Sequence, residues 1–427
     1  MAEGKSANAR PNIVLVVADD MGYGDCGCFG SDYIKTPNID TVAERGVRFS
    51  DFHSNGALCS PTRAALLTGR YQQRSGIEGV ISAKNHRHVG LPFEERTFAE
   101  VLKGAGYRTA LFGKWHLGYE KRFNPSKRGF DEFVGFVSGN IDYRSHIDQV
   151  GIEDWWKADE LTPEDGYTTD LVTKHGLRFI EDGVREDRYR PFCLYLAHEC
   201  PHYPYQGPHD DAYRTPGNPR PINGPREDKR QAYKEMMECM DAGIGKILDC
   251  VRANGIEENT LVFFFSDNGP SGPGSAGTLR GGKGTVWEGG HRVPAAACWP
   301  GTIPPGTETD ATCIGMDLFP TMLAMAGVEP PPGLELDGAD IMPVMTGGAP
   351  RLERDLFWRL KGKRAVRSGK WKLVLGERDA EERELFDLET DLSESENLAG
   401  DRPDLADELE KKLVAWETDV SMGEQLS

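Results

Sequence analysis

Several common features are missing from this chain of 427 residues. No apolar run approaches the ~18 residues that a membrane-spanning helix needs, so we expect no transmembrane segment. Internal repeats and heptad patterns are also missing, which argues against solenoids and coiled coils. The nine cysteines include no Cys-x-x-Cys pair, so a zinc site of the usual spacing is not expected.

The chain has fewer basic than acidic residues, which limits the kinds of partner that it could bind. Lys and Arg number 50 against 68 Asp and Glu, which gives a formal net charge of −18. Such a chain lacks the broad basic surface that nucleic acids bind, so no nucleic-acid partner is expected. An anionic ligand would need cations gathered at one place.

The start of the chain lacks the apolar core of a signal peptide. Met1-Ala2-Glu3-Gly4-Lys5 leads to the first apolar run by Ile13. We therefore expect either an intracellular protein or a periplasmic or secreted one whose leader has been removed. The cysteines other than Cys59 would allow disulfides, but buried free thiols are the simpler expectation.

One short segment, Cys59-Ser60-Pro61-Thr62-Arg63, is the most informative in the chain. Ser60 and Pro61 suit the beginning of a helix and Gly69 suits its end, so we expect a helix with Cys59 at its N-terminus. Free N–H groups there favour a thiolate, and Arg63 adds a cation one turn later. A lone cysteine is usually an inert, buried thiol, but this context indicates a reactive one.

Four apolar runs each lead into residues that can do chemistry. They are 13–18 before Asp19 and Asp20, 109–112 before Lys114 and His116, 192–197 before His198, and 261–265 before Asp267 and Asn268. Continuous apolar runs of this length predict strands buried on both faces, as in a parallel sheet covered by helices. Because ligands of such sheets bind at the carboxyl ends of the strands, all four sets should meet at one edge.

Three carboxylates and one amide at two of these strand ends make an oxygen-rich cluster: Asp19, Asp20, Asp267 and Asn268. The carboxylates would repel one another without a cation. Oxygen ligands with no paired cysteine or histidine suit calcium or magnesium better than zinc. A single aspartate pair is as often a turn or a helix cap, but two strand ends together with the cysteine motif favour a metal site.

The Cys-x-Pro-x-Arg core at Cys59 resembles the signature of the formylglycine-dependent, Cys-type sulfatases (type I) of the alkaline phosphatase superfamily. The resemblance implies that a separate maturation enzyme oxidises Cys59 to formylglycine, whose hydrated aldehyde is the nucleophile. It also implies one divalent ion, usually Ca²⁺ with Mg²⁺ as the alternative, bound by Asp19, Asp20, Asp267 and Asn268.

The same resemblance implies roles for the cationic residues. Arg63 would steady the formylglycine, Lys114 would contact it and the sulfate, and His116 would be the base of the elimination step. His198 and Lys283 would flank the bridging oxygen of the leaving group. Lys283 lies in a glycine-rich segment, 279–290, that is also similar to sulfatase sequence.

Substrate contacts are expected outside these motifs. Their candidates are Tyr143, Arg144, His146, His202 and Arg280. Local cations would focus positive potential in an otherwise acidic protein, so long polyanionic substrates should bind with marked salt dependence.

The chain divides at a segment rich in proline and glycine, 327–348. We expect a catalytic α/β domain over 10–335, with a large mixed, mostly parallel sheet sandwiched between helices. Beyond it, strand-like pieces at 355–360, 364–375 and 384–388 precede a charged helix at 401–420. This order predicts a smaller α+β subdomain over 336–427, an antiparallel sheet with one helix, similar to the C-terminal subdomain of sulfatases.

The predicted function is hydrolysis of a sulfate monoester, small or oligosaccharide, with a maturation enzyme as partner. The polar and aromatic character of Tyr143, Trp155, Trp156 and Tyr203 favours a carbohydrate sulfate. Two alternatives stay open. One is a phosphonate monoester hydrolase or phosphodiesterase of the same superfamily, and the other is a sulfated-glycan binding protein in which Cys59 is never converted.

Overall fold

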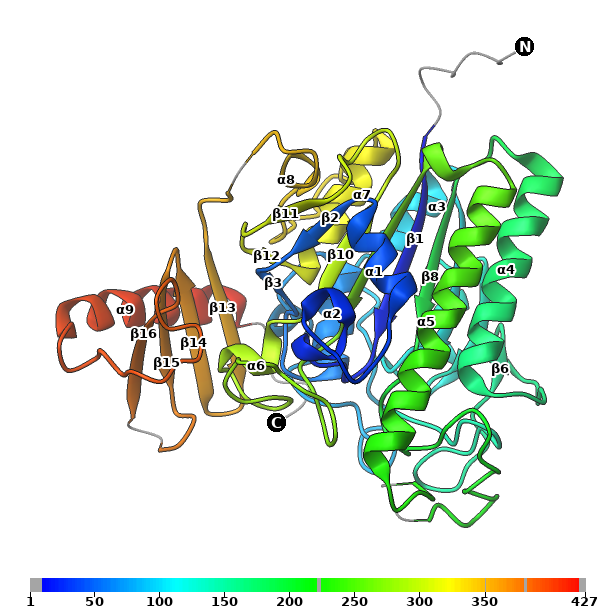
Figure 1. Ribbon diagram of the computed structural model, residues 1–427, viewed down its shortest axis with the longest axis horizontal. Coiled ribbons are helices and arrows are strands. Elements are labelled where there is room, and N and C mark those ends of the chain that lie inside the picture. The colour runs from blue at the N-terminus through cyan, green and yellow to red at the C-terminus, as the bar shows by residue number, and fades with distance from the viewer. Residues whose placement is uncertain (1–9, 221–223, 350, 380–381, 422–427) are drawn as a thin grey trace.

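The computed structural model describes residues 10–421, apart from 221–223, 350 and 380–381, and is drawn in Figure 1. Most of the chain builds one large sheet with helices on both faces. Its strand order is β11-β2-β10-β9-β1-β8-β4-β5-β6-β7. The bounds are β1 Asn12–Ala18, β2 Val47–Phe49, β4 Arg108–Lys114, β5 Glu132–Phe136, β6 Trp156–Lys157, β7 Glu160–Leu161, β8 Phe192–Ala197, β9 Thr260–Ser266, β10 Ala295–Cys298 and β11 Thr307–Thr309.

The four apolar runs form the adjacent central strands β9, β1, β8 and β4, which pair in parallel. Strand β5 extends the parallel part, whereas β10, β6 and β7 run antiparallel to their neighbours. The sheet is therefore mixed and mostly parallel, and the predicted fold class is confirmed. A separate pair, β3 Phe52–His53 and β12 Cys313–Ile314, is also parallel.

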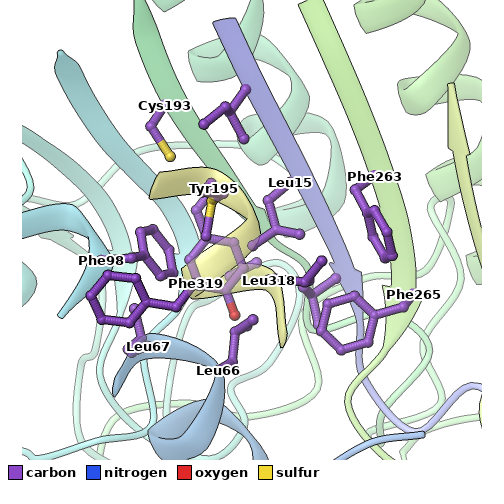
Figure 2. Packing of buried hydrophobic residues seen from close by; sticks show 14 of the residues in the cluster. Leu15, Leu66, Leu67, Phe98, Cys193, Tyr195, Phe263, Phe265, Leu318 and Phe319 are labelled. Carbon is purple, nitrogen blue, oxygen red and sulfur yellow. The ribbon is translucent and has the colours of Figure 1, made fainter. Parts of the chain in front are cut away.

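Alternate residues of β1 supply two separate cores. Leu15 and its odd-numbered neighbours pack with α2 Cys59–Thr68, α3 Phe98–Gly104 and α7 Leu318–Ala326. Figure 2 shows this side, where Leu66, Leu67, Phe98 and Phe319 gather near Leu15, and Phe263 lies next to Phe265 on the neighbouring strand. Even-numbered residues face the opposite core with α1 Pro37–Glu44, α4 Thr168–Asp187 and α5 Lys229–Ala253. Burial on both faces explains why these strands read as unbroken apolar runs.

The C-terminal part forms its own antiparallel sheet, which lies at one end of the molecule in Figure 1 with α9 Pro403–Val420 against it. Its strands are β13 Asp355–Leu360, β14 Lys363–Ser368, β15 Trp371–Leu375 and β16 Arg383–Asp387. The single strand expected over 364–375 is wrong: Gly369, with φ of 57°, turns the chain between two strands.

The division at residue 335 stays a prediction. Ile341 and Val344 lie beyond it, yet they pack into the core of the large sheet. Val344 belongs to the short helix α8 Met342–Met345.

The remaining helices are short. Helix α6 spans Glu288–His291. Short 3-10 helices lie at Tyr23–Asp25, Gly27–Phe29, Gln72–Ser75, Lys121–Phe123, Pro125–Lys127, Glu257–Asn259 and Gly315–Asp317.

All nine cysteines are free, as expected. Over the described part of the chain, the helices are either too short or too polar to cross a bilayer.

Candidate active site

The carboxyl ends of β1 and β9 bring the acidic residues together. Val17 of β1 pairs with Phe265 of β9, so the segments that follow these two strands leave the sheet side by side. Asp267 N–H then donates to the Ala18 carbonyl at 3.0 Å, and Asp20 N–H donates to Asp267 Oδ1 at 3.3 Å. Asp20 has a φ of 65°, a left-handed conformation that aspartate tolerates. Sheet register therefore builds the carboxylate cluster.

Cys59 begins α2, which ends at Gly69 with a φ of 66°, so the predicted helix is confirmed. The Cys59 side chain is 1% exposed. Its Sγ lies 3.6 Å from Asp19 Oδ1 and 3.5 Å from Lys283 Nζ. Burial, and next the charge of Asp19, raises the pKa of the thiol to about 12. The expected thiolate is therefore wrong for unmodified Cys59, because burial outweighs the helix terminus and the nearby lysines.

Arg63 and Lys114 bind the carboxylates from the other side. Arg63 Nε donates to Asp267 Oδ2 at 3.0 Å, and its Nη2 lies 3.5 Å from Asp19 Oδ2. The Lys114 ammonium contacts the same Asp19 oxygen. Arg63 Nη1 also donates to the Lys114 carbonyl at 3.0 Å, which ties the end of β4 to α2.

Lys283 completes the pairing. Its Nζ lies 2.6 Å and 2.8 Å from the two carboxylate oxygens of Asp20. Burial alone would raise the pKa of Asp20, but the Lys283 and His202 charges hold it below its ordinary range. Three carboxylates thus face three cations, so side chains of the protein already supply the positive charge that the carboxylates were expected to need.

The donor set nevertheless fits a divalent ion. Ligand atoms of Asp19, Asp20, Cys59 and His202 lie within 4.8 Å of one another. Asn268 Oδ1 is buried without a hydrogen-bond partner, and its amide nitrogen lies 2.8 Å from Asp20 Oδ1. A partnerless buried amide oxygen beside carboxylates has the chemistry of a hard-metal ligand. Asp19, whose pKa burial and Asp267 raise to about 7, would also be favoured in its ionised form by a cation.

A second group of acid and histidine side chains, His53, Glu288 and His291, does not have this character. The Lys372 ammonium lies 2.9 Å from Glu288 Oε1 and 3.2 Å from His291 Nε2. The Lys372 ammonium therefore already occupies the position that a metal ion would take in that cluster.

His116 is held in one tautomer. Its Nε2 lies 3.2 Å from the Ile81 carbonyl, which can only accept, so Nε2 carries the proton. Nδ1 is buried without a partner and keeps its lone pair. Burial, and next the charge of Lys114, lowers the pKa of His116 well below its ordinary value. The ring is thus a neutral imidazole with a free acceptor nitrogen.

Of the two histidines after β8, His202 meets the charged residues. Its Nε2 lies 3.6 Å from Asp20 Oδ2, and its Nδ1 lies 2.7 Å from the Tyr203 carbonyl. His198 also lies at the strand end, where its backbone N–H donates to the Val17 carbonyl at 2.9 Å. Burial alone lowers the pKa of His198 to about 3, with no charged group contributing. His202 and Lys283 thus both contact Asp20, and the expected role of His198 beside Lys283 stays a prediction.

The other substrate candidates make contacts within the fold. Tyr143 is buried and donates from its hydroxyl to the His202 carbonyl at 2.9 Å. Arg144 donates to the carbonyls of Pro208 and Asp210, and His146 stacks on Trp155 with 4.5 Å between ring centroids. Arg280 lies over Trp287 at 3.9 Å and donates to Glu384 Oε1 at 3.1 Å. As substrate contacts they stay predictions.

Two residues near the site were not among the predicted site residues. Ser60 Oγ accepts from Ile81 N–H at 3.1 Å, and the Ile81 carbonyl in turn orients His116. This link joins the helix of Cys59 to the candidate base. Glu199 Oε1 accepts from Ile141 N–H at 2.7 Å, and burial raises the pKa of Glu199 well above its ordinary value. Its position directly after His198 was the only available hint.

Cys59, the acid cluster and three cations thus meet at one edge of the sheet, an arrangement that suits the hydrolysis of an anionic ester. The family described as Sulfatase matches residues 11–328, and one described as N-sulphoglucosamine sulphohydrolase, C-terminal, matches residues 282–419. The chain belongs to the sulfatase family. It is a sulfuric ester hydrolase, and enzymes of this family generally use formylglycine and a divalent metal.

Individual relatives resemble most of the chain. Human arylsulfatase A is 38% identical over 412 residues, which are 87% of this chain and 76% of that protein. N-acetylgalactosamine-6-sulfatase of Canis lupus familiaris is 37% identical over 371 residues, 82% of this chain and 68% of that protein. Among solved structures, Ps i-CgsB in complex with k-i-k-neocarrahexaose is 30% identical with a TM-score of 0.87, covering 97% of this chain and 94% of that one.

Proposed function

We propose that this sulfatase releases sulfate from a sulfated carbohydrate, with a formylglycine made from Cys59 as nucleophile. The observation that carries the proposal is the position of Cys59 Sγ, 3.6 Å from Asp19 and 3.5 Å from Lys283. This sulfur stands in for an oxygen of the aldehyde hydrate. The carbohydrate class is supported by N-acetylgalactosamine-6-sulfatase and by Ps i-CgsB bound to an oligosaccharide.

We propose Ca²⁺ as the divalent ion, held by Asp19, Asp20, Asp267 and Asn268. When bound, it supplies positive charge that polarises the sulfuryl oxygens. Oxygen donors favour Ca²⁺ or Mg²⁺, and several carboxylates that can bind through one or both oxygens suit the larger coordination number of Ca²⁺. With the ion and three cations against three carboxylates, the site would carry a net charge of +2 before the anionic ester enters.

In the first step, one hydroxyl of the aldehyde hydrate attacks sulfur in line and passes its proton to Asp19, whose Oδ1 lies 3.6 Å from Cys59 Sγ. The bond between sulfur and the bridging oxygen then breaks. Burial lowers the pKa of His202 well below its ordinary value, so its ring is neutral before the ester binds. We propose that His202 takes up a proton together with the anionic ester and donates it from Nε2 to the departing alcohol, while its Nδ1–H stays bonded to the Tyr203 carbonyl. Lys283 stabilises the negative charge on that oxygen as it develops. Lys114 and Arg63 hold Asp19 and the nucleophile in place.

In the second step, His116 Nδ1 takes the proton of the remaining hydroxyl. The C–O bond to the sulfate then breaks, inorganic sulfate leaves, and the aldehyde returns to be hydrated by water. The hydrogen bond from His116 Nε2 to the Ile81 carbonyl keeps Nδ1 free for this proton. Covalent catalysis thus divides one difficult displacement into two easier reactions.

The maturation enzyme would act before the fold closes. Cys59 is 1% exposed, and the residues on either side of it are held by hydrogen bonds of Gly56, Ser60 and Thr62. A second enzyme therefore cannot reach the thiol in the native state. We propose that the partner recognises the extended segment around Cys59 during synthesis.

The test is sulfate release from a panel of sulfated mono- and oligosaccharides, an aryl sulfate and a phenylphosphonate monoester. The enzyme is co-expressed with a formylglycine-generating enzyme, conversion is measured by peptide mass, and Cys59→Ala is the control. Release from a sugar sulfate that is lost in the control supports the proposal. Converted protein that cleaves only the phosphonate would refute it, and an unconverted protein that binds sulfated sugars without turnover would indicate the binding-protein alternative.

A further inference from the structure

The loop that carries Lys283 is anchored to both halves of the site through its backbone. Lys283 N–H donates to the Pro270 carbonyl at 3.0 Å, two residues after Asn268. Gly284 N–H donates to the Ala57 carbonyl at 2.9 Å, two residues before Cys59. The position of the Lys283 ammonium therefore depends on how this loop lies against the loops of the metal ligands and the nucleophile.

The loop has little structure of its own. It runs between β9 and α6 without a helix or strand. Gly281 and Gly284 have φ of 82° and 84°, in the left-handed region that favours glycine. Glycine-rich segments of this kind lose much conformational entropy on ordering, so contacts from outside must fix the conformation.

One ion pair of the C-terminal sheet supplies such contacts. Lys363, the first residue of β14, donates from Nζ to the Gly284 carbonyl at 2.9 Å. The same ammonium lies 2.9 Å from Glu377 Oε2, whose side chain is 1% exposed. The other carboxylate oxygen of Glu377 accepts from Val286 N–H. The ion pair therefore binds the loop at Gly284 and at Val286, the residues on either side of Thr285 and directly after Lys283.

We propose that Lys363 and Glu377 are positioning residues for Lys283, so that the C-terminal subdomain completes the active site without touching the reacting atoms. The inference rests on the proposed role of Lys283 at the bridging oxygen. A misplacement of about 1 Å at a catalytic group costs on the order of 10²-fold in rate. Loss of the hydrogen bond to the Gly284 carbonyl and of the ion pair with Glu377 would leave the loop free to make such a shift.

The pair is separable from the docking of the subdomain itself. Lys372 Nζ lies 2.9 Å from both Glu288 Oε1 and Glu394 Oε1, and all three side chains are fully buried. Trp358 adds a hydrogen bond from Nε1 to the Ser54 carbonyl at 2.9 Å. These contacts hold α6 and the sheet together when Lys363 is changed, so the perturbation should stay local to the loop.

The experiment compares Lys363→Met with Lys370→Met. Lys370 lies in the turn before β15 of the same sheet, and its ion pair with Asp387 at 2.6 Å leaves the Lys283 loop untouched. We expect Lys363→Met to lower kcat by 10- to 100-fold on a sugar sulfate, with KM changed less than threefold, and Lys370→Met to match the parent. Lys363→Arg, which keeps a donor, should recover part of the rate.

The dependence on the leaving group separates positioning from general damage. Lys283 stabilises charge on the leaving oxygen, which matters most for poorly leaving alcohols. The defect of Lys363→Met should therefore shrink on a nitrophenyl sulfate, and in a Lys283→Met background it should nearly vanish. Equal losses on all leaving groups, or additive losses with Lys283→Met, would overturn the inference. Glu377→Gln provides the same comparisons if Lys363→Met does not fold.

A readout independent of turnover distinguishes the two proposals. Amide hydrogen exchange of peptides covering 279–290 should rise at least tenfold in Lys363→Met and stay unchanged in Lys370→Met. Unchanged exchange in both variants would refute the positioning role. If the parent cleaves no sulfate ester, the proposed function fails, while hydrogen exchange still decides whether the ion pair orders the loop.

Discussion

The two histidines after β8 provide a discriminating prediction. His202→Ala should abolish most turnover and leave the fold intact, whereas His198→Ala should affect stability and leave chemistry largely unchanged. The basis is geometric: His202 Nε2 lies 3.6 Å from Asp20 Oδ2 and faces the charged cluster. No charged group contributes to the lowered pKa of His198, which burial alone explains.

The magnitude follows from the proposed proton transfer. A positioned general acid contributes roughly 10²- to 10⁴-fold, or about 3–5 kcal/mol of transition-state stabilisation. His202→Ala should lose that factor in both kcat and kcat/KM on a sugar sulfate, and less on an aryl sulfate with a good leaving group. His198→Ala removes a buried ring and should lower the free energy of unfolding by about 1–3 kcal/mol.

The assay combines initial rates of sulfate release with urea unfolding of the same preparations. Both variants need the same degree of Cys59 conversion, checked by peptide mass. A His198→Ala enzyme that folds with parental stability but loses 10²-fold or more in kcat, beside an active His202→Ala enzyme, would refute the assignment.

Three other predictions follow from the site and its surroundings. Added Ca²⁺ at 100 times its Kd should stabilise the fold by about 2.7 kcal/mol, seen as a higher Tm that EDTA reverses and that Asp267→Asn abolishes; an unchanged Tm would contradict the metal site. Burial raises the pKa of Asp25 to about 6, so the folded protein keeps a proton that the unfolded chain loses near pH 4. Stability should therefore fall by about 3 kcal/mol as pH rises from about 4 to about 6, and Asp25→Asn should remove that slope in urea unfolding; an identical slope in both proteins would rule the effect out. Raising ionic strength should increase KM for a polysulfated oligosaccharide much more than for a monosulfated sugar, and parallel changes would show that no focused potential acts beyond the sulfate itself.

Much of the framework could be predicted from local sequence. The runs ending at Ala18, Phe112, Ala197 and Phe265 are almost entirely apolar because each strand is buried on both faces. Their parallel arrangement places the following polar residues at one edge, as ligand sites of such sheets require. The helix of Cys59 was equally readable, since its beginning and its glycine end depend on neighbouring residues only.

Other features depend on which distant segments meet. Burial makes Cys59 a neutral thiol before maturation, and Lys283 pairs with Asp20 from 263 residues away. His202, not the strand-end His198, reaches Asp20 because the chain turns back after the strand. Sequence periodicity carries no information about such a return path.

The sequence by itself therefore determined the central strands, the helix of the nucleophile and the family signature, because each rests on residues close together in the chain. The tertiary structure alone decided which histidine faces the charged cluster, how each carboxylate is paired, and that Lys363 of the C-terminal sheet holds Gly284 beside Lys283. Those outcomes depend on packing and loop paths between distant segments, and burial there changes the charge state that a side chain would have in water.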